Sequence, residues 1–376
     1  MTSRERLERA IRCQPVDRTP LRIWGFDHRQ KQTEPSRERL AEIAREHQLD
    51  LINGWFPRPE LGPFYSPPGL VRVETATAES SHEGFVEDIA TYHTPGGKLE
   101  ARHLRSLHGK PGYESKYLIE TPGDAEKWLS IPRGSPAISN ISSLSQARQE
   151  LGDDGIVQVL PFSDPMYQIN ALTGSQIWAY WLKEERELLH RLVAETQART
   201  IILLKALLAA GATGVFGYVG PELCIPPLAS PRDFEDFVVR YDKPIHDLIH
   251  EAGGQVWVHC HGKMGPVLEK FAEEGVDCLN PLEPPPMGDI TVAQARARVG
   301  DRMSFDGGLE VGDFELLSPA RIGEMTEAAI EASQGRGLIL SPTSDFSHWP
   351  VLSERILENV RAFLAVGREV GARVCG

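Results

Sequence analysis

Two kinds of hydrophobic pattern alternate along most of the chain. Short apolar runs rich in β-branched and aromatic residues predict strands. Longer segments with apolar residues three and four positions apart predict helices between them. The eight predicted strands are PLRIW (from Pro20), LDLIN (from Leu49), GIVQVLPF (from Gly155), TGVFGYVG (from Thr213), QVWVHCH (from Gln255), VDCLNPLE (from Val276), RMSFDGG (from Arg302) and GLILSP (from Gly337).

Several predicted helices carry recognisable start signals. Ser36 is expected to cap the helix in SRERLAEIAREHQ, and Ser-Pro pairs at Ser230 and Ser318 place a proline at the first helical position. Strands that alternate with helices indicate a parallel sheet, and near-continuous apolar strands indicate burial on both faces. Eight such units predict an α/β fold, a (β/α)8 TIM barrel. The competing Rossmann-type fold is disfavoured because no Gly-x-Gly-x-x-Gly follows an early strand.

The segment 57–131 does not fit this repeat. It is rich in proline, glycine, histidine and tyrosine, and it contains the hairpin-like stretch GFVEDIATYHTPGGKLEARHL. We therefore predict a long excursion after the second strand of a single barrel domain that spans residues 1–376.

Composition narrows the classes of function. The chain of 376 residues has 53 acidic and 40 basic residues, a net charge of −13, which disfavours binding to nucleic acids or anionic membranes. The charged N-terminus does not resemble a signal peptide, and no apolar run is long enough to predict a membrane span. Five scattered cysteines without a Cys-x-x-Cys motif favour a reducing, cytoplasmic location.

Polar residues gather where the predicted strands end. In a parallel barrel, these carboxyl ends meet at one mouth, where the chemistry of such folds lies. The beginning of loops explains part of this polarity. The strand-end residues are Trp24, Asp27, His28, Phe162, Ser163, Asp164, Tyr218, Glu222, His259, His261, Asn280, Glu283, Asp306, Ser341, Asp345 and His348.

The stretch VWVHCHGKMG, from Val256 to Gly265, is the most informative of these strand ends. Strand alternation places Trp257, His259 and His261 on the inner face and Cys260 on the outer face. Two imidazoles two residues apart, about 6–7 Å between Cα atoms, can bind one metal ion, and Glu283 could add a carboxylate. The alternative is a pair of hydrogen-bonded histidines without a metal.

Other strand-end residues are candidates for catalysis or substrate binding. Glu222 fits a metal ligand, a base or a solvated loop acid. Asp306 lies beside two glycines that let a ligand approach closely, which favours a catalytic role. His348 fits a solvated loop residue or a substrate contact.

Three aromatic residues at strand ends complete the predicted site. We expect Trp24, Phe162 and Tyr218 to bind substrate, since each lies where a predicted strand meets the mouth of the barrel.

Over nearly its whole length, the chain resembles the uroporphyrinogen decarboxylase superfamily. The resemblance runs from RERLERAIRCQPVDRTPLRIW through PFSDPMYQINALTG to GLILSPTSDFSHWPVLSERILENV, and it is strongest around QVWVHCHG and GDRMSFDGG. It implies the same barrel fold and a homodimer. True decarboxylases of this superfamily carry a Met-Arg-Gln-Ala-Gly-Arg stretch that holds substrate carboxylates. Here the matching WGFDHRQKQTEP keeps only Arg29 and Gln30, which disfavours uroporphyrinogen as substrate.

The other branch that the chain resembles contains zinc-dependent methyltransferases that use a corrinoid. Their motif is His-x-Cys-Gly with a further cysteine near the last strand. Here His259-Cys260-His261-Gly262 replaces that cysteine with histidine, and LILSPTSDFSH has none. A His/His/carboxylate set suits an oxygen or nitrogen substrate better than a thiol.

The resemblance and the residues together give a leading hypothesis and two alternatives. The leading one is a metal-dependent methyltransferase or demethylase of small molecules, with zinc on His259, His261 and Glu283 or Glu222, and a partner protein carrying a corrinoid. Asp306 would position or deprotonate the substrate. The alternatives are a metal-free decarboxylase of a small aromatic or pyrrolic acid and a non-catalytic binding barrel.

Overall fold

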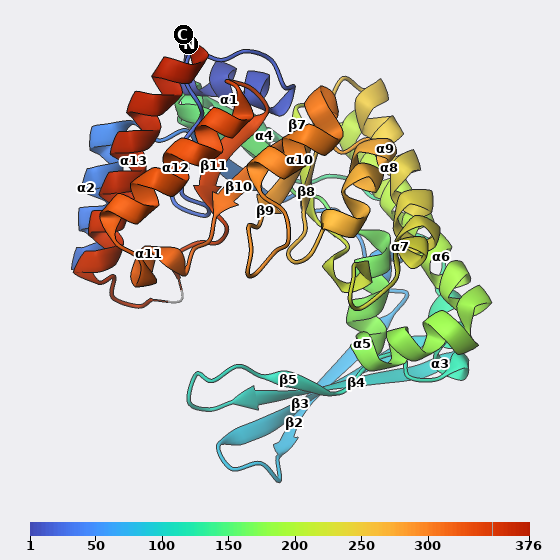
Figure 1. The fold of residues 1–376 in the computed structure, drawn as a ribbon. Coiled ribbons are helices and arrows are strands. Elements are labelled where there is room, and N and C mark those ends of the chain that lie inside the picture. The colour runs from blue at the N-terminus through green and yellow to red at the C-terminus, as the bar shows by residue number, and fades with distance from the viewer. Residues whose placement is uncertain (348) are drawn as a thin grey trace.

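The computed structural model describes residues 1–347 and 349–376 and is built around a curled parallel sheet (Figure 1). Its seven strands pair in the order β1-β6-β7-β8-β9-β10-β11. Seven of the eight predicted runs are therefore strands, and the parallel α/β class is confirmed. The strands are β1 (Leu51–Trp55), β6 (Gly155–Val159), β7 (Val215–Val219), β8 (Gln255–His259), β9 (Cys278–Leu282), β10 (Ser304–Leu309) and β11 (Leu338–Pro342).

The first predicted strand, PLRIW, is reduced to one parallel bridge between Leu21 and Leu340 of β11. The Leu21 carbonyl also accepts a hydrogen bond of 2.9 Å from the Asp50 amide, just before β1. The segment thus lies between the two outer strands of the sheet. A turn at Trp24 and Gly25 ends the pairing, so the predicted eighth strand does not form in the described chain.

Helices follow most of the strands and pack against the outer face of the sheet. Figure 1 shows α2, α12 and α13 together on one side and α5 to α9 on the other. The helices are α1 (Ser3–Ile11), α2 (Pro35–His47), α3 (Pro122–Leu129), α4 (Ile141–Leu151), α5 (Pro165–Glu184), α6 (Arg186–Ala209), α7 (Pro231–Phe234), α8 (Arg240–Glu251), α9 (Leu268–Glu274), α10 (Val292–Val299), α11 (Asp313–Leu316), α12 (Pro319–Ser333) and α13 (Glu354–Cys375).

Helix α1 closes the inner face of the sheet at the amino ends of the strands. Its side chains Leu7, Ala10 and Ile11 are buried in one cluster with the strand side chains Ile156, Val215, Trp257, Cys278 and Ile339. Burial of this apolar layer stabilises the fold by about 25 cal/mol for each Å² removed from water. A ligand must therefore enter from the opposite end, at the carboxyl ends of the strands.

The predicted excursion contains a second, antiparallel sheet. Its strands are β2 (Arg72–Glu79), β3 (Phe85–Thr94), β4 (Gly97–Ser106) and β5 (Tyr113–Lys116), paired in chain order. The predicted hairpin is confirmed, because β3 and β4 pair from Phe85 with Ser106 to Thr94 with Gly97. Figure 1 shows this sheet apart from the parallel one.

None of the helices in the described ranges combines the length and apolar character that a membrane crossing requires.

Candidate functional site

A cavity of about 640 Å³ opens at the carboxyl ends of β1, β6, β7 and β8. Its volume is within the range of small-molecule sites. Trp24, Phe162 and Tyr218, the aromatic residues expected to bind substrate, all line it, as does His259. Further lining residues are Arg22, Ile52, Phe56, Tyr65, Gln158, Leu160, Ser163, Gln168 and Trp257.

His259 at the end of β8 is held as a neutral imidazole. Its Nδ1 lies 2.8 Å from Oδ1 of Asn280, whose Nδ2 donates to the Asp306 carbonyl at 3.3 Å. This pair of contacts orients the amide so that Nδ1–H of His259 donates to it. Trp24 and Trp257 stack against the ring, at centroid distances of 5.6 and 6.0 Å. Burial lowers the pKa of His259 to about 4, so at neutral pH Nε2 is unprotonated and its lone pair is free to accept a hydrogen bond or bind a metal ion.

His261 is held in the same way by a carboxylate. Its Nδ1 lies 2.8 Å from Oε1 of Glu283, and the Gly262 amide donates to Oε2 of Glu283 at 2.5 Å. Burial works against charge on His261, but the hydrogen bond and charge of Glu283 outweigh it and raise its pKa. The His259 and His261 rings meet edge to face at 4.7 Å.

The structure therefore gives Glu283 a different place from the one expected. Both of its oxygens are engaged, by His261 and by Gly262, so it lies behind an imidazole rather than beside it. A carboxylate in this position orients a metal-binding histidine and raises its basicity. Direct coordination by Glu283 would compete with these two hydrogen bonds.

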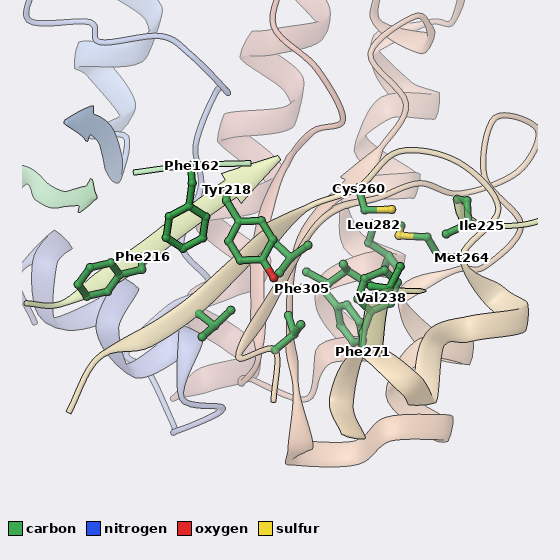
Figure 2. Packing of buried hydrophobic residues seen from close by; sticks show 14 of the residues in the cluster. Phe162, Phe216, Tyr218, Ile225, Val238, Cys260, Met264, Phe271, Leu282 and Phe305 are labelled. Atoms are coloured by element: carbon green, nitrogen blue, oxygen red, sulfur yellow. The ribbon is translucent and has the colours of Figure 1, made fainter. Parts of the chain in front are cut away.

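Cys260, the residue directly after β8, continues the strand alternation and points to the outer side of the sheet, as predicted. Its side chain is fully buried in the core between sheet and helices, and Figure 2 shows it in the same cluster as Met264 and Leu282. Burial raises the pKa of its thiol well above the usual range. It is therefore placed as a small apolar residue, away from the imidazoles.

Glu222 begins a 3-10 turn (Glu222–Cys224) after β7 and lies near His261. Burial raises its pKa to about 7, while the charge of His261 opposes that rise. Its Oε2 is buried and has no hydrogen-bond partner in the described part of the chain. Glu310, whose pKa is also raised by burial, and Glu283 add to the negative field on His261.

Asp306 of β10 is fully buried and does not line the cavity. Its Oδ2 accepts a hydrogen bond of 2.6 Å from Arg22, and its Oδ1 accepts one of 2.8 Å from Ser341. Arg22 lines the cavity and lies between Asp306 and the space where a substrate would bind. The role of Asp306 in positioning or deprotonating the substrate stays a prediction, and in this structure its carboxylate is hydrogen-bonded to Arg22.

The hydroxyl group of Tyr218 points away from the cavity. It donates to Oδ2 of Asp242 in α8 at 3.1 Å and also contacts Nε2 of His246. Asp164 lies beside Asp242, and burial raises the pKa of both carboxyl groups, so this pair holds a proton. Only the ring of Tyr218 is available to a ligand, next to Phe162 at a centroid distance of 5.6 Å (Figure 2).

Two further residues from the sequence analysis remain to be placed, His348 and Arg29. His348 falls outside the described residues. Arg29 does not line the cavity and forms ion pairs with Asp27 and Asp154. The residual arginine of the decarboxylase motif is thus engaged elsewhere.

The two imidazoles are the part of the site best suited to a metal ion. Their Nδ1 atoms are occupied by acceptors, and neither Nε2 atom has a partner within residues 1–347 and 349–376. In those same ranges, no three His, Cys, Asp or Glu side chains converge in a metal-binding arrangement. His259 and His261 fit two ligands, and Glu222, whose Oε2 atom is buried and unpartnered in the described structure, is a candidate for a third.

Sequence reasoning missed two polar residues of this site. Arg22 and Gln158 lie inside apolar runs, PLRIW and GIVQVLPF, and both line the cavity. A single charged or amide residue inside an otherwise apolar strand was the available signal, because burial of such a group is costly without a partner.

Comparison with known proteins identifies the family. The model of the uroporphyrinogen decarboxylase (URO-D) family matches residues 159–370, more than half of the chain. A uroporphyrinogen decarboxylase from Psychromonas ingrahamii is 35% identical over 158 residues. That match covers 41% of this chain and 41% of the relative.

Solved structures support the fold. A methyltransferase from Methanosarcina mazei has a TM-score of 0.57 at 16% identity, over 98% of this chain and 99% of its own. At that identity the likeness concerns the fold alone. A B12-independent methionine synthase from Shewanella sp. has a TM-score of 0.43 at 10% identity, over 89% of this chain and 86% of its own. This likeness is too weak to support a conclusion about fold or function.

Proposed function

Because the chain belongs to the uroporphyrinogen decarboxylase family, we propose that it is a metal-dependent methyltransferase or demethylase of that family. The main observation behind this proposal is the pair of imidazoles of His259 and His261. The Nδ1 atom of each is hydrogen-bonded to a side-chain oxygen, and the two ring centroids lie 4.7 Å apart. Metal-binding histidines nearly always donate their second ring N–H to a carboxylate, carbonyl or amide oxygen in this way.

The proposed ligands are Nε2 of His259, Nε2 of His261 and the carboxylate of Glu222. Glu222 must turn toward the imidazoles, since the three side chains do not converge in the described structure. Its buried, unpartnered oxygen and the acidic surroundings of His261 both favour a cation. When bound, zinc would supply a Lewis acid for a substrate oxygen or nitrogen atom.

The other residues of the site hold this arrangement in place. Asn280 fixes the tautomer of His259, Glu283 fixes that of His261, and Trp24 stacks on His259 at the cavity wall. The cysteine between the histidines is buried in the core, so the set contains no thiolate. Such a set suits oxygen or nitrogen substrates better than thiols.

The proposal includes a partner. The methyl group would pass to or from a corrinoid on a separate protein, and the enzyme would be a homodimer, as the family resemblance implies.

Transfer of a methyl group to free cob(I)alamin tests this function. The protein is given a panel of methyl ethers and methylamines, and methylcobalamin is followed by its absorbance. We expect the formation of methylcobalamin to be lost with a chelator and restored by zinc. It should also be lost in His261→Ala but kept in His250→Ala, because His250 pairs with Asp277 and does not line the cavity. Turnover that survives chelation would refute metal dependence.

Glu222 also supports a second candidate, a metal-free decarboxylase. A carboxyl group with a pKa of about 7 is protonated in part at neutral pH and could protonate the carbanion that remains after CO2 leaves. The curated relative named uroporphyrinogen decarboxylase is consistent with this chemistry. Chelator-resistant CO2 release from an aromatic or pyrrolic acid would favour it.

A further inference from the structure

The cavity floor carries hydrogen-bond donors from three separate elements. They are the Arg22 guanidinium before β1, the Gln158 amide on β6 and the Trp257 indole on β8, and all three side chains line the cavity. Each residue is at most 5% exposed. The curl of the sheet thus brings together donors from distant parts of the chain, and the most distant pair, Arg22 and Trp257, is more than 200 positions apart.

These donors lack acceptors. Gln158 Nε2 and Trp257 Nε1 are buried and unpartnered across the described ranges. Arg22 uses Nη1 for Asp306, and its other N–H groups have no acceptor among the described side chains and carbonyls. A buried donor without a partner costs stability that an incoming acceptor restores.

Charge points to the kind of acceptor. Among the described residues that line the cavity, Arg22 is the one arginine or lysine, and no Asp or Glu is present. Asp306, which neutralises Arg22 from behind, is itself held by Ser341. The guanidinium fork can share its remaining N–H groups with a second carboxylate.

The walls define the rest of the ligand. Trp24, Phe56, Tyr65, Phe162 and Trp257 surround a space of about 640 Å³, enough for one or two planar rings. We propose that this cavity binds a planar aromatic carboxylate, with its carboxylate group on Arg22 and its ring among these side chains. The inference rests on the proposed function and deepens it, since it names the substrate class at the same site.

The position of these donors matters more than their unpartnered state. Gln255 Nε2 and Trp178 Nε1 are also buried and unpartnered in the described structure, yet neither residue lines this cavity. They supply matched controls for Gln158 and Trp257. Gly217 adds a second sign of a built floor, because a Cβ there would lie 2.2 Å from Gln158 Nε2.

Calorimetric titration of the full-length protein with benzoate and benzamide tests the proposal. The two probes share a ring and differ in charge. We expect benzoate to bind about tenfold more tightly or better, because a hydrogen bond to a charged group is worth more than one to a neutral group. Equal binding of the two probes, or no benzoate binding at millimolar concentration, would overturn the proposal.

Variants locate the site. The double variant Arg22→Gln with Asp306→Asn removes the buried pair together, so that neither charge is left alone, and should weaken benzoate about tenfold. Gln158→Leu and Trp257→Phe should each weaken benzoate several-fold, while Gln255→Leu and Trp178→Phe should not. An equal loss of affinity in the control variants would show that Gln158 and Trp257 stabilise the fold and do not bind the ligand directly.

A chelator separates this proposal from the proposed function. Benzoate should bind equally with and without chelator, since Arg22 and not the imidazoles holds it. Benzoate binding by a protein that takes up no metal would refute the metal-dependent function and leave the carboxylate site standing. Metal uptake without benzoate binding would refute the carboxylate site and leave the metal-dependent function standing.

Discussion

The side chains of β8 lie where the alternation of the strand predicts. Trp257 and His259 line the cavity, and Cys260 lies in the outer core. Their partners could not be read from the sequence, because the contacts of His259 with Asn280 and of His261 with Glu283 depend on the register between β8 and the following strand. The sequence therefore predicts which residues face the site, but not which of them contact a ligand directly and which only orient a neighbouring side chain.

Arg22 and Asp306 form a buried pair whose loss should be costly. Asp306→Asn would leave the Arg22 guanidinium buried without its counter-charge, so we expect the free energy of unfolding to fall by about 3–5 kcal/mol. Asp154→Asn is the control, because its ion pair with Arg29 is largely exposed and should contribute less than about 1 kcal/mol. Urea unfolding measures both. Equal losses would show that burial of the Arg22 pair does not matter.

The two glutamates near His261 should differ in their effect on a bound metal. If Glu222 is a ligand, Glu222→Gln should abolish retention of zinc on dialysis. Glu283→Gln should weaken zinc affinity by about 10–100-fold, as expected for a residue that orients a ligand. Competition with a chromogenic chelator measures the affinities. The opposite ranking would restore Glu283 as the direct ligand.

The first residues of the helices show which local sequence signals are enough to predict where a helix begins. Ser230 and Ser318 cap α7 and α12, with Pro231 and Pro319 in the first turn, as predicted. The prediction for Ser36 is wrong, because α2 begins at Pro35 and the side chain of Glu34 accepts the Arg37 amide instead. A Ser-Pro pair fixes both the cap and the first helical residue, whereas a lone serine leaves other caps open.

The layer between the sheet and α8 and α9 holds carboxyl groups that sequence patterns did not reveal. Glu274, at the end of α9, is fully buried, and its oxygens have no partner in the described structure. Burial raises its pKa well above the usual range, which favours the protonated form in the folded protein. A raised folded pKa means that stability is greatest below the unfolded pKa, about 4.3, and falls as pH rises toward the folded value.

Glu274→Gln should therefore stabilise the protein increasingly with pH. We expect similar unfolding midpoints for variant and wild type near or below pH 4, and an advantage for the variant that widens as pH rises above the unfolded pKa of about 4.3. The exposed neighbour Glu273 provides the control, since Glu273→Gln removes the same charge from water. A gap that stays constant with pH, or appears equally in the control, would contradict the raised pKa of Glu274.

At the scale of the whole molecule, the alternation of strands and helices was sufficient to predict a parallel α/β fold. It did not predict that the run PLRIW would pair through Leu21 alone, since pairing there depends on β11 and on the start of β1. The antiparallel sheet of the excursion was predicted only as a hairpin. Its outer strands, β2 and β5, are polar and exposed, so they lack the hydrophobic pattern that marks a strand.

Metal content is the most direct test of the central claim, that His259 and His261 form a metal site. Elemental mass spectrometry of the purified protein should find about one zinc ion per chain, lost in both His259→Ala and His261→Ala and kept in His250→Ala. This result would establish the pair as ligands and support metal-dependent methyl transfer. A wild-type protein that takes up no zinc after incubation with it, or equal zinc in all variants, would contradict the claim and favour the decarboxylase.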